Sequence, residues 1–375
     1  MKIEMVDLKG QYRKIQEEID TAVLKAIHEA NFINGPEVAS FTKNLSAYLG
    51  GAHVIPCANG TDALQIAMMA LDLKPGDEVI VPSFTYVATA EVIGLLQLKP
   101  VMVDVDPVHF NITKANIEQA IGPKTKAIVP VHLFGQCADM EPILALAKER
   151  GLYVIEDTAQ AIGAVYKFSD GTQKQAGTMG HIGCTSFFPS KNLGCYGDGG
   201  AIYAHDSVLA ERIKMVANHG QVKKYVHRYI GVNSRLDTIQ AAVLDIKLKY
   251  LDQYSAARQS AADWYDQLLS GIEGLQTPER AMNSTHVFHQ YTMLIKNGKR
   301  NALKQHLEAA GIPAMVYYPV PLNEQEAFHA IGAVVGSLKE TELLCASVLS
   351  LPMHTELTEE QQIFITDTIK SFFKL

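Results

Sequence analysis

The chain has 375 residues, enough for two or three lobes; 47% of them are hydrophobic, 19% are charged, and the formal net charge is −7. This composition excludes a disordered chain, and the acidic balance disfavours a nucleic-acid binder, which usually carries a basic excess. No apolar run approaches the roughly 18 residues of a membrane span, and the first segment is too polar for a signal peptide, so we expect a cytoplasmic protein without membrane or nucleic-acid partners.

Strand-like apolar runs alternate with helical patterns from about residue 57 to residue 204. Strands are predicted at residues 79–82, 101–105, 127–132, 153–157, 182–188 and 199–204, and helices at residues 86–97, 113–121 and 141–150. Repeated strand–helix units predict an α/β fold with a mostly parallel sheet covered by helices. Strand runs that are apolar on both faces fit such a buried sheet.

The pattern becomes mainly helical after residue 206. Helices are predicted at residues 207–217, 236–269, 301–310 and 359–373, with a strand at residues 291–295. Strands are fewer here, and we expect them to pair antiparallel. We place a boundary near residue 245, with an N-terminal arm and a large domain in residues 1–245 and a small α+β domain in residues 246–375.

Several common ligand-binding motifs are missing from the chain. It contains no complete GxGxxG, no GxxxxGK[ST], no HExxH and no GxSxG. The five cysteines include no CxxC pair, so neither a disulfide framework nor a metal site is indicated. The ligand must be held by another device, and three segments near the ends of predicted strands are candidates, because open α/β sheets bind ligands there.

The first segment is Asn59-Gly60-Thr61, directly before a helical run. Gly60 permits close approach of the backbone, Thr61 offers a hydroxyl, and a helix N-terminus attracts phosphate. The alternative is a plain helix start, with Thr61 or Asp62 as its cap.

The second segment follows the predicted strand that ends at Asp157. A carboxylate at the end of an apolar strand is costly unless it meets a cation or hydrogen-bond donors. A protonated pyridine nitrogen would be such a partner, and Gln160 follows closely enough to reach the same ligand. The alternative is that Asp157 caps a helix.

The third segment contains Lys191 in an apolar, glycine-rich turn. Desolvation there would lower the pKa of the amine and create a nucleophile, whereas a lone lysine is usually a solvated surface residue. Ser186 lies five positions earlier and could bind a phosphate. A phosphate cradle, an acid for a pyridinium nitrogen and a Schiff-base lysine are together what pyridoxal phosphate (PLP) needs.

The segments NGTDAL, PSFTYVATAE, VIEDTAQAIGA, TSFFPSKNLGCYGDGGA and GVNSRLDTIQAA resemble those of the DegT/DnrJ/EryC1/StrS sugar aminotransferases. The resemblance extends from DLKGQY through SLPMH. It implies a fold-type I, aspartate-aminotransferase-like PLP enzyme that aminates a nucleotide-linked keto sugar with L-glutamate. The segments CANGTDALQ, HGQVKKY and YYPVPLNEQ imply UDP-2-acetamido-2-deoxy-3-oxo-D-glucuronate as the sugar, for surface polysaccharide and O-antigen biosynthesis.

The resemblance also implies roles for individual residues. Lys191 would form the Schiff base and move the proton, Asp157 would pair with the pyridine nitrogen, and Gln160 would contact the ring hydroxyl. The remaining cofactor contacts would be Gly60, Thr61 and Ser186 at the phosphate, Tyr86 stacked on the ring, and Asn233 reaching the phosphate from the second subunit of a homodimer with shared active sites. Substrate contacts would come from His219, Arg235, Tyr317, Tyr318 and His354.

Some interpretations stay open at this point. Related enzymes often have a histidine at the position of Tyr317. The basic segment from His219 to Arg235 is either a clamp for diphosphate or carboxylate or a solvated loop, and His354 either faces the cleft or caps a loop. A dTDP- or UDP-linked 3-keto or 4-keto 6-deoxy sugar is the alternative substrate. A dehydratase would replace Lys191 with histidine, and nothing favours a non-catalytic PLP or nucleotide-sugar binding protein.

Overall fold

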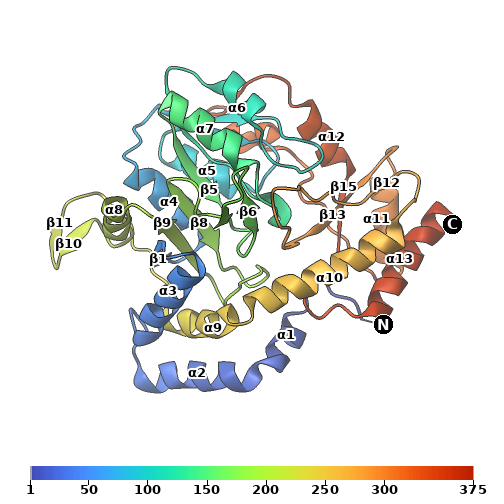
Figure 1. Ribbon diagram of the computed structural model, residues 1–375, viewed down its shortest axis with the longest axis horizontal. Helices are drawn as coiled ribbons and strands as arrows, with labels where there is room; N and C mark the ends of the chain where they lie inside the picture. The colour runs from blue at the N-terminus through green and yellow to red at the C-terminus, as the bar shows by residue number, and fades with distance from the viewer. Residues whose placement is uncertain (1, 375) are drawn as a thin grey trace.

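A central eight-stranded sheet organises the molecule, a computed structural model that describes residues 2–374 (Figure 1). Its strand order is β1-β9-β8-β5-β4-β2-β3-β14. The strands are β1 (His53–Cys57), β2 (Glu78–Pro82), β3 (Lys99–Val103), β4 (Thr125–Ile128), β5 (Tyr153–Asp157), β8 (Ile182–Ser186), β9 (Gly200–Ala204) and β14 (Ala333–Val334). β9 runs antiparallel to both of its neighbours, and the other pairs are parallel, which confirms the predicted mostly parallel sheet.

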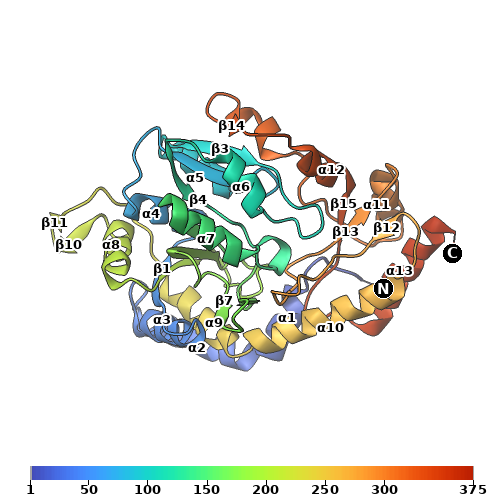
Figure 2. The same ribbon diagram turned by 45° about the horizontal axis from the view of Figure 1, so that its top comes forward.

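Helices cover both faces of this sheet (Figure 2). They are α4 (Gly60–Ala70), α5 (Ala88–Leu95) and α8 (Ser207–Ala217) on one face, and α6 (Lys114–Ala120) and α7 (Met140–Arg150) on the other. Successive side chains of a strand point to opposite faces, so Val79 and Val81 pack with the first group and Ile80 with the second. The apolar strand runs of the sequence therefore reflect a sheet buried on both faces.

Three helices precede the sheet and were not predicted. They are α1 (Leu8–Lys14), α2 (Gln16–Glu29) and α3 (Pro36–Tyr48), and the last two pack against α9 (Thr238–Leu248). The single helix predicted at residues 236–269 is wrong, because the chain breaks at Lys249 and Tyr250 before α10 (Leu251–Leu269). The Tyr250 hydroxyl donates a hydrogen bond to Glu18 of α2, so tertiary contacts end α9 where no Gly or Pro marks the sequence.

The C-terminal part contains a second, antiparallel sheet of β12 (Leu275–Gln276), β13 (Tyr291–Ile295) and β15 (Val348–Leu351). It has its own core with α10, α11 (Arg300–Ala309) and α13 (Glu359–Phe373). The strand at 291–295 and the helices at 207–217 and 359–373 are confirmed residue for residue. A capping box, in which Thr358 and Gln361 bond reciprocally, begins α13.

Shorter elements complete the chain. They are the hairpins β6 (Val165–Lys167) with β7 (Gln173–Gln175) and β10 (Gln221–Lys223) with β11 (Val226–His227), helix α12 (Lys339–Ser347), and 3-10 turns at Leu133–Gly135, Leu322–Glu324 and Glu326–Phe328. β14 lies beyond the boundary expected near residue 245 yet pairs with β3 of the large sheet; that boundary stays a prediction. Within residues 2–374, every helix is too short or too polar to cross a membrane.

Candidate active site

The start of α4 forms a cradle beside the end of β8. A Cβ on Gly60 would lie 2.7 Å from Cβ of Ser186, so only glycine lets these two segments approach so closely. The cap of α4 is Asn59, whose side chain accepts from the Asp62 N–H at 2.8 Å, and not Thr61 or Asp62. The N–H groups of Gly60 and Thr61 have no partner within the described residues, and such free donors at a helix N-terminus bind phosphate.

Ser186 completes this cradle from the end of β8. Its hydroxyl oxygen accepts from the Phe188 N–H at 3.2 Å, which leaves the hydroxyl proton available to an acceptor. The Ala58 N–H next to the cradle donates to the Ser234 hydroxyl at 3.0 Å, so the segment that carries Asn233 and Arg235 is anchored close by. The free N–H groups at the start of α4 and the hydroxyl at the end of β8 thus lie side by side.

Asp157 lies at the carboxyl end of β5 and is buried, with 7% of the residue exposed. One oxygen accepts from the Thr89 hydroxyl at 3.0 Å and the other from the Ala159 N–H at 3.1 Å. Burial raises the pKa of this carboxyl, while these donors and the Lys191 charge oppose the rise. The residues that directly follow Asp157 form turns and no helix, so the helix-cap alternative is wrong. A buried carboxylate contacted by neutral donors is suited to a cationic ligand group.

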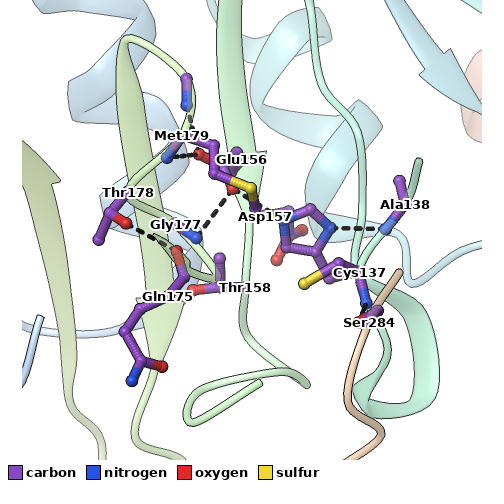
Figure 3. A network of polar contacts seen from close by, with 12 residues as sticks. Cys137, Ala138, Glu156, Asp157, Thr158, Gln175, Gly177, Thr178, Met179 and Ser284 are labelled. Atoms are coloured by element: carbon purple, nitrogen blue, oxygen red, sulfur yellow. Dashed lines mark hydrogen bonds and ion pairs between the residues drawn. The ribbon is translucent and has the colours of Figure 1, made fainter. Parts of the chain in front are cut away.

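Glu156, the residue before Asp157, anchors β5 through a network of hydrogen bonds, which Figure 3 shows. Glu156 is fully buried, and its carboxylate accepts four hydrogen bonds, from His132 Nε2 at 2.9 Å and from the N–H groups of Gly177 at 2.8 Å, Met179 at 2.7 Å and Gly180 at 2.5 Å. This network was not predicted from the sequence. A charged residue second from the end of an apolar strand, with a histidine ending the neighbouring run, was the available signal.

Lys191 lies in the loop between β8 and β9, partly buried. Burial lowers the pKa of its amine to about 8, and the negative charge of Asp157 opposes that effect. Each of the two side chains therefore senses the charge of the other. The loop is ordered by hydrogen bonds from the Lys191 N–H to the Phe188 carbonyl at 2.8 Å and from the Asn192 amide to the Val287 carbonyl at 2.9 Å.

Aromatic residues and Gln160 form a further wall. The Gln160 amide accepts from the Phe134 N–H at 2.7 Å and donates to the Tyr318 hydroxyl at 3.0 Å. The Tyr318 ring lies 6.3 Å from the ring of Tyr86 and 6.1 Å from that of Tyr317, centroid to centroid. Burial raises the pKa of Tyr318, so its hydroxyl stays neutral at physiological pH. Tyr86 is more than half exposed and free to meet a ligand.

Four predicted residues form no hydrogen bond or ion pair with the site residues described above. Asn233 is exposed and bridges to Asn218, and His219 is exposed next to the β10–β11 hairpin, which projects from the body in Figure 1. Arg235 is partly buried and without an ion pair in residues 2–374. His354 is buried, and its Nδ1 accepts from the Glu356 N–H at 3.2 Å, which is a loop cap. Burial lowers the pKa of His354 to about 4.

Comparison with known proteins identifies the family. The model of the DegT/DnrJ/EryC1/StrS aminotransferase family matches residues 13–370. The chain belongs to this family. A UDP-2-acetamido-2-deoxy-3-oxo-D-glucuronate aminotransferase from Pseudomonas aeruginosa is 47% identical to this DegT/DnrJ/EryC1/StrS protein over 94% of the chain and 95% of its own length. A UDP-N-acetyl-3-dehydro-alpha-D-glucosamine 3-aminotransferase from Acidithiobacillus ferrooxidans is 44% identical over 98% of this chain and 97% of its own length.

Solved structures of the family agree in fold. An aminotransferase of the same family from Brucella abortus superposes with a TM-score of 0.95 at 42% identity, covering 100% of both chains. NtdA from Bacillus subtilis, solved with the bound cofactor PMP, superposes with a TM-score of 0.91 at 31% identity, covering 100% of this chain and 86% of its own. The protein is therefore a PLP-dependent sugar aminotransferase.

The residues of the site fit that cofactor. The Gly60 cradle offers free N–H donors for a phosphate, Asp157 offers a buried carboxylate for a pyridinium nitrogen, and Lys191 offers an amine of lowered pKa for an aldehyde. When bound, PLP supplies an electron-accepting ring for transamination. Within residues 2–374 no cluster of His, Cys, Asp and Glu has the arrangement of a metal site.

Proposed function

We propose that this enzyme transfers the amino group of L-glutamate to UDP-2-acetamido-2-deoxy-3-oxo-D-glucuronate, in the cytoplasm, for surface polysaccharide such as O-antigen. The chemistry is supported by one observation above all, the Lys191 amine of lowered pKa beside the buried Asp157. The choice of sugar is supported by the Pseudomonas aeruginosa relative, which matches at 47% identity over nearly the full length of both chains.

Lys191 is the proposed acid and base of the reaction. A general base works best when its pKa lies near the working pH, and about 8 meets that condition, whereas the ordinary lysine value of 10.5 does not. The amine takes the proton from the carbon of the amino donor and returns a proton to the carbon of the sugar. Asp157 keeps the proton on the cofactor's ring nitrogen, because a carboxylate in a buried site strongly favours a facing cation.

The other cofactor contacts follow from the same arrangement. Gly60, Thr61 and Ser186 are proposed to hold the phosphate, Gln160 to contact the ring hydroxyl, and Tyr86 to stack on the ring. The hydrogen bond between Gln160 and Tyr318 supports one joint wall for cofactor and substrate. On the substrate side, the proposed contacts are Tyr317 and Tyr318 in this wall, with His219 and Arg235 from outside it.

A homodimer with shared active sites is part of the proposal. The projecting hairpin region exposes large apolar side chains, with Tyr225 82% and Ile230 87% exposed, and α2 leads into Phe32 and Ile33, which are about half exposed. Apolar surface of this kind is typical of a protein interface. In a two-fold dimer each contact occurs twice, so Asn233 of each subunit would serve the phosphate of the other.

A panel of nucleotide sugars tests the substrate. Purified enzyme is given L-glutamate with UDP- and dTDP-linked sugars that carry a 3-keto or a 4-keto group, and 2-oxoglutarate formation is measured. We expect the UDP-linked 3-oxo-glucuronate to react fastest. Turnover confined to 4-keto 6-deoxy sugars would refute the substrate. Turnover of dTDP-linked 3-keto sugars would favour the second candidate, which a 37% identical dTDP-3-amino-3,4,6-trideoxy-alpha-D-glucose transaminase from Streptomyces venezuelae supports.

A further inference from the structure

A second lysine lies under the active-site loop. Lys247, in the last turn of α9, is only 1% exposed. Its ammonium donates a hydrogen bond to the Gly194 carbonyl at 2.6 Å and lies 5.2 Å from the centre of the Tyr196 ring, within the usual range of a cation–π contact. The structure gives it no carboxylate partner in residues 2–374. Burying an unpaired charge is costly, so a lysine here calls for a specific reason.

The carbonyl that Lys247 contacts belongs to the loop that carries Lys191. Gly194 comes three residues after Lys191, and its carbonyl has no other hydrogen-bond partner within the described residues. The loop folds tightly on itself here, because a Cβ on Gly194 would lie 2.4 Å from the Pro189 carbonyl oxygen. The Cys195 N–H donates to the Phe187 carbonyl at 2.8 Å. A shift at Gly194 would therefore move the turn that holds Lys191.

The same face of α9 makes a second contact with this loop. Gln240 lies seven residues before Lys247, which is two helical turns and hence the same face. Its amide oxygen accepts from the Tyr196 N–H at 2.8 Å, and its amide nitrogen donates to the Tyr196 carbonyl at 3.4 Å. α2 and α3 pack against α9 as well. The loop thus rests on a helix that is itself fixed, and Lys247 supplies the contact nearest to Lys191.

We propose that Lys247 is a positioning residue for Lys191, which it holds in place through the Gly194 carbonyl and the Tyr196 ring. The proposal rests on the proposed role of Lys191. A lysine suits the task because its long apolar stem packs in the core while its compact ammonium reaches a single carbonyl. Burial lowers the pKa of Lys247 to about 8, and the neutral amine can still donate to Gly194, so the contact survives the loss of a proton.

Lys247→Met tests the proposal, because methionine keeps much of the length and apolar character of the side chain and removes the donor. The visible absorbance band of bound PLP gives the rate at which apoenzyme takes up PLP and the pH midpoint at which the band titrates. The kcat and the KM for L-glutamate are measured as well. We expect the uptake rate and kcat to fall about 10- to 100-fold, since a displacement of about 1 Å costs this much, and KM to stay within about twofold of wild type. The pH midpoint should move away from the wild-type value, because the displaced Lys191 amine has different surroundings. Affinity for PMP, which needs no covalent link, should not change.

Two further variants sharpen the comparison. Lys249→Met, two residues away on the surface and paired with Glu18, is the matched control and should behave as wild type. Lys247→Gln keeps an N–H donor and should recover part of the uptake rate and shift the pH midpoint back. If Lys247 only stabilised the fold, Lys247→Met would lower the stability of the protein and both rates alike, and the pH midpoint would stay that of wild type.

Each outcome of these measurements either supports or refutes the positioning role. Wild-type uptake, midpoint and kcat in Lys247→Met would overturn the proposal, whatever happens to stability. If that variant does not fold, Gln240→Leu loosens the same loop at Tyr196, and unchanged uptake there would overturn the proposal equally. Lys191→Ala separates a failure of the proposed role of Lys191 from a failure of the positioning role of Lys247. Turnover that survives in Lys191→Ala refutes the role of Lys191 itself. An inactive Lys191→Ala together with a normal Lys247→Met refutes only the positioning role.

Discussion

Replacing Gly60 with alanine should weaken cofactor binding selectively. The added Cβ would lie 2.7 Å from Cβ of Ser186 and 3.3 Å from its hydroxyl oxygen, whereas ordinary carbon contacts begin near 3.5 Å. Ser186 or the start of α4 must therefore move by several tenths of an ångström. Both are proposed phosphate ligands, so the displacement opens the cradle in which the phosphate is held.

The size of the effect follows from the cost of overpacking. Forcing one extra methyl into a filled site costs about 1–3 kcal/mol. If that cost is expressed in binding, the Kd for PLP rises about 5- to 150-fold, at about 1.4 kcal/mol for each tenfold change. The assay is a titration of apoenzyme with PLP, followed by visible absorbance, beside a thermal unfolding curve of the apoenzyme.

A matched control separates binding from general damage. Gly122→Ala adds the same methyl at a site where the nearest atom is the flexible end of the Glu78 side chain, at 3.3 Å, far from the cradle. It should leave the Kd for PLP unchanged. A Kd in Gly60→Ala within twofold of wild type would show that Gly60 does not approach the phosphate, and the cradle would have to be abandoned.

Three other predictions address the charged groups. Glu156→Gln leaves two of the four buried donors facing an NH₂ group, and each unpaired donor costs about 1–3 kcal/mol. The unfolding free energy from a denaturant titration should therefore fall by about 2–6 kcal/mol. The control Glu149→Gln changes an exposed residue and should cost under about 0.5 kcal/mol. The rate of PLP uptake should rise with pH through a midpoint near pH 8 and level off above it, because burial lowers the pKa of Lys191 to about 8 and only the neutral amine reacts. A midpoint near 10.5 would contradict the burial argument. Thr89→Val removes a donor that lowers the pKa of Asp157, so the carboxylate is lost at a higher pH and the acidic limb of kcat should move upward; an unmoved limb would refute the contact.

Local patterns in the sequence predicted most of the sheet and several helices. Continuous apolar runs indicated the strands at 79–82 and 153–157, and the helix at 359–373 begins at a Thr–Gln capping pair that is visible in the sequence. The break at Lys249 and Tyr250 carries no Gly or Pro and is set by contacts with α2. β14 has only two residues, and its pairing with β3 defines it as a strand, so no local pattern could reveal it.

The residues of the site likewise fall into two groups, those that could be recognised in the sequence and those that could not. Gly60, Asp157, Gln160, Ser186 and Lys191 end or follow strands, and their residue types alone marked them in the sequence. Glu156, Thr89 and Lys247 act through hydrogen bonds to segments distant in the chain, and such partners become visible only in three dimensions. The contact of Asn233 with the phosphate of a second subunit, and those of Arg235 and His219 with the substrate, stay predictions.

The return of the chain to the large sheet has a mechanical consequence. The chain passes between the large and the small sheet three times, first through α9 and α10, then from Met315 to β14, and finally from β14 through α12 to β15. The second is fastened at both ends, by the bridge of Met315 to Ser350 in the small sheet and by the hydrogen bond from the Leu322 N–H to the Ser83 carbonyl at 3.0 Å. The segment that carries Tyr318 is thus tied to both sheets, so the wall with Tyr318 can shift relative to either sheet only if one of these contacts gives way.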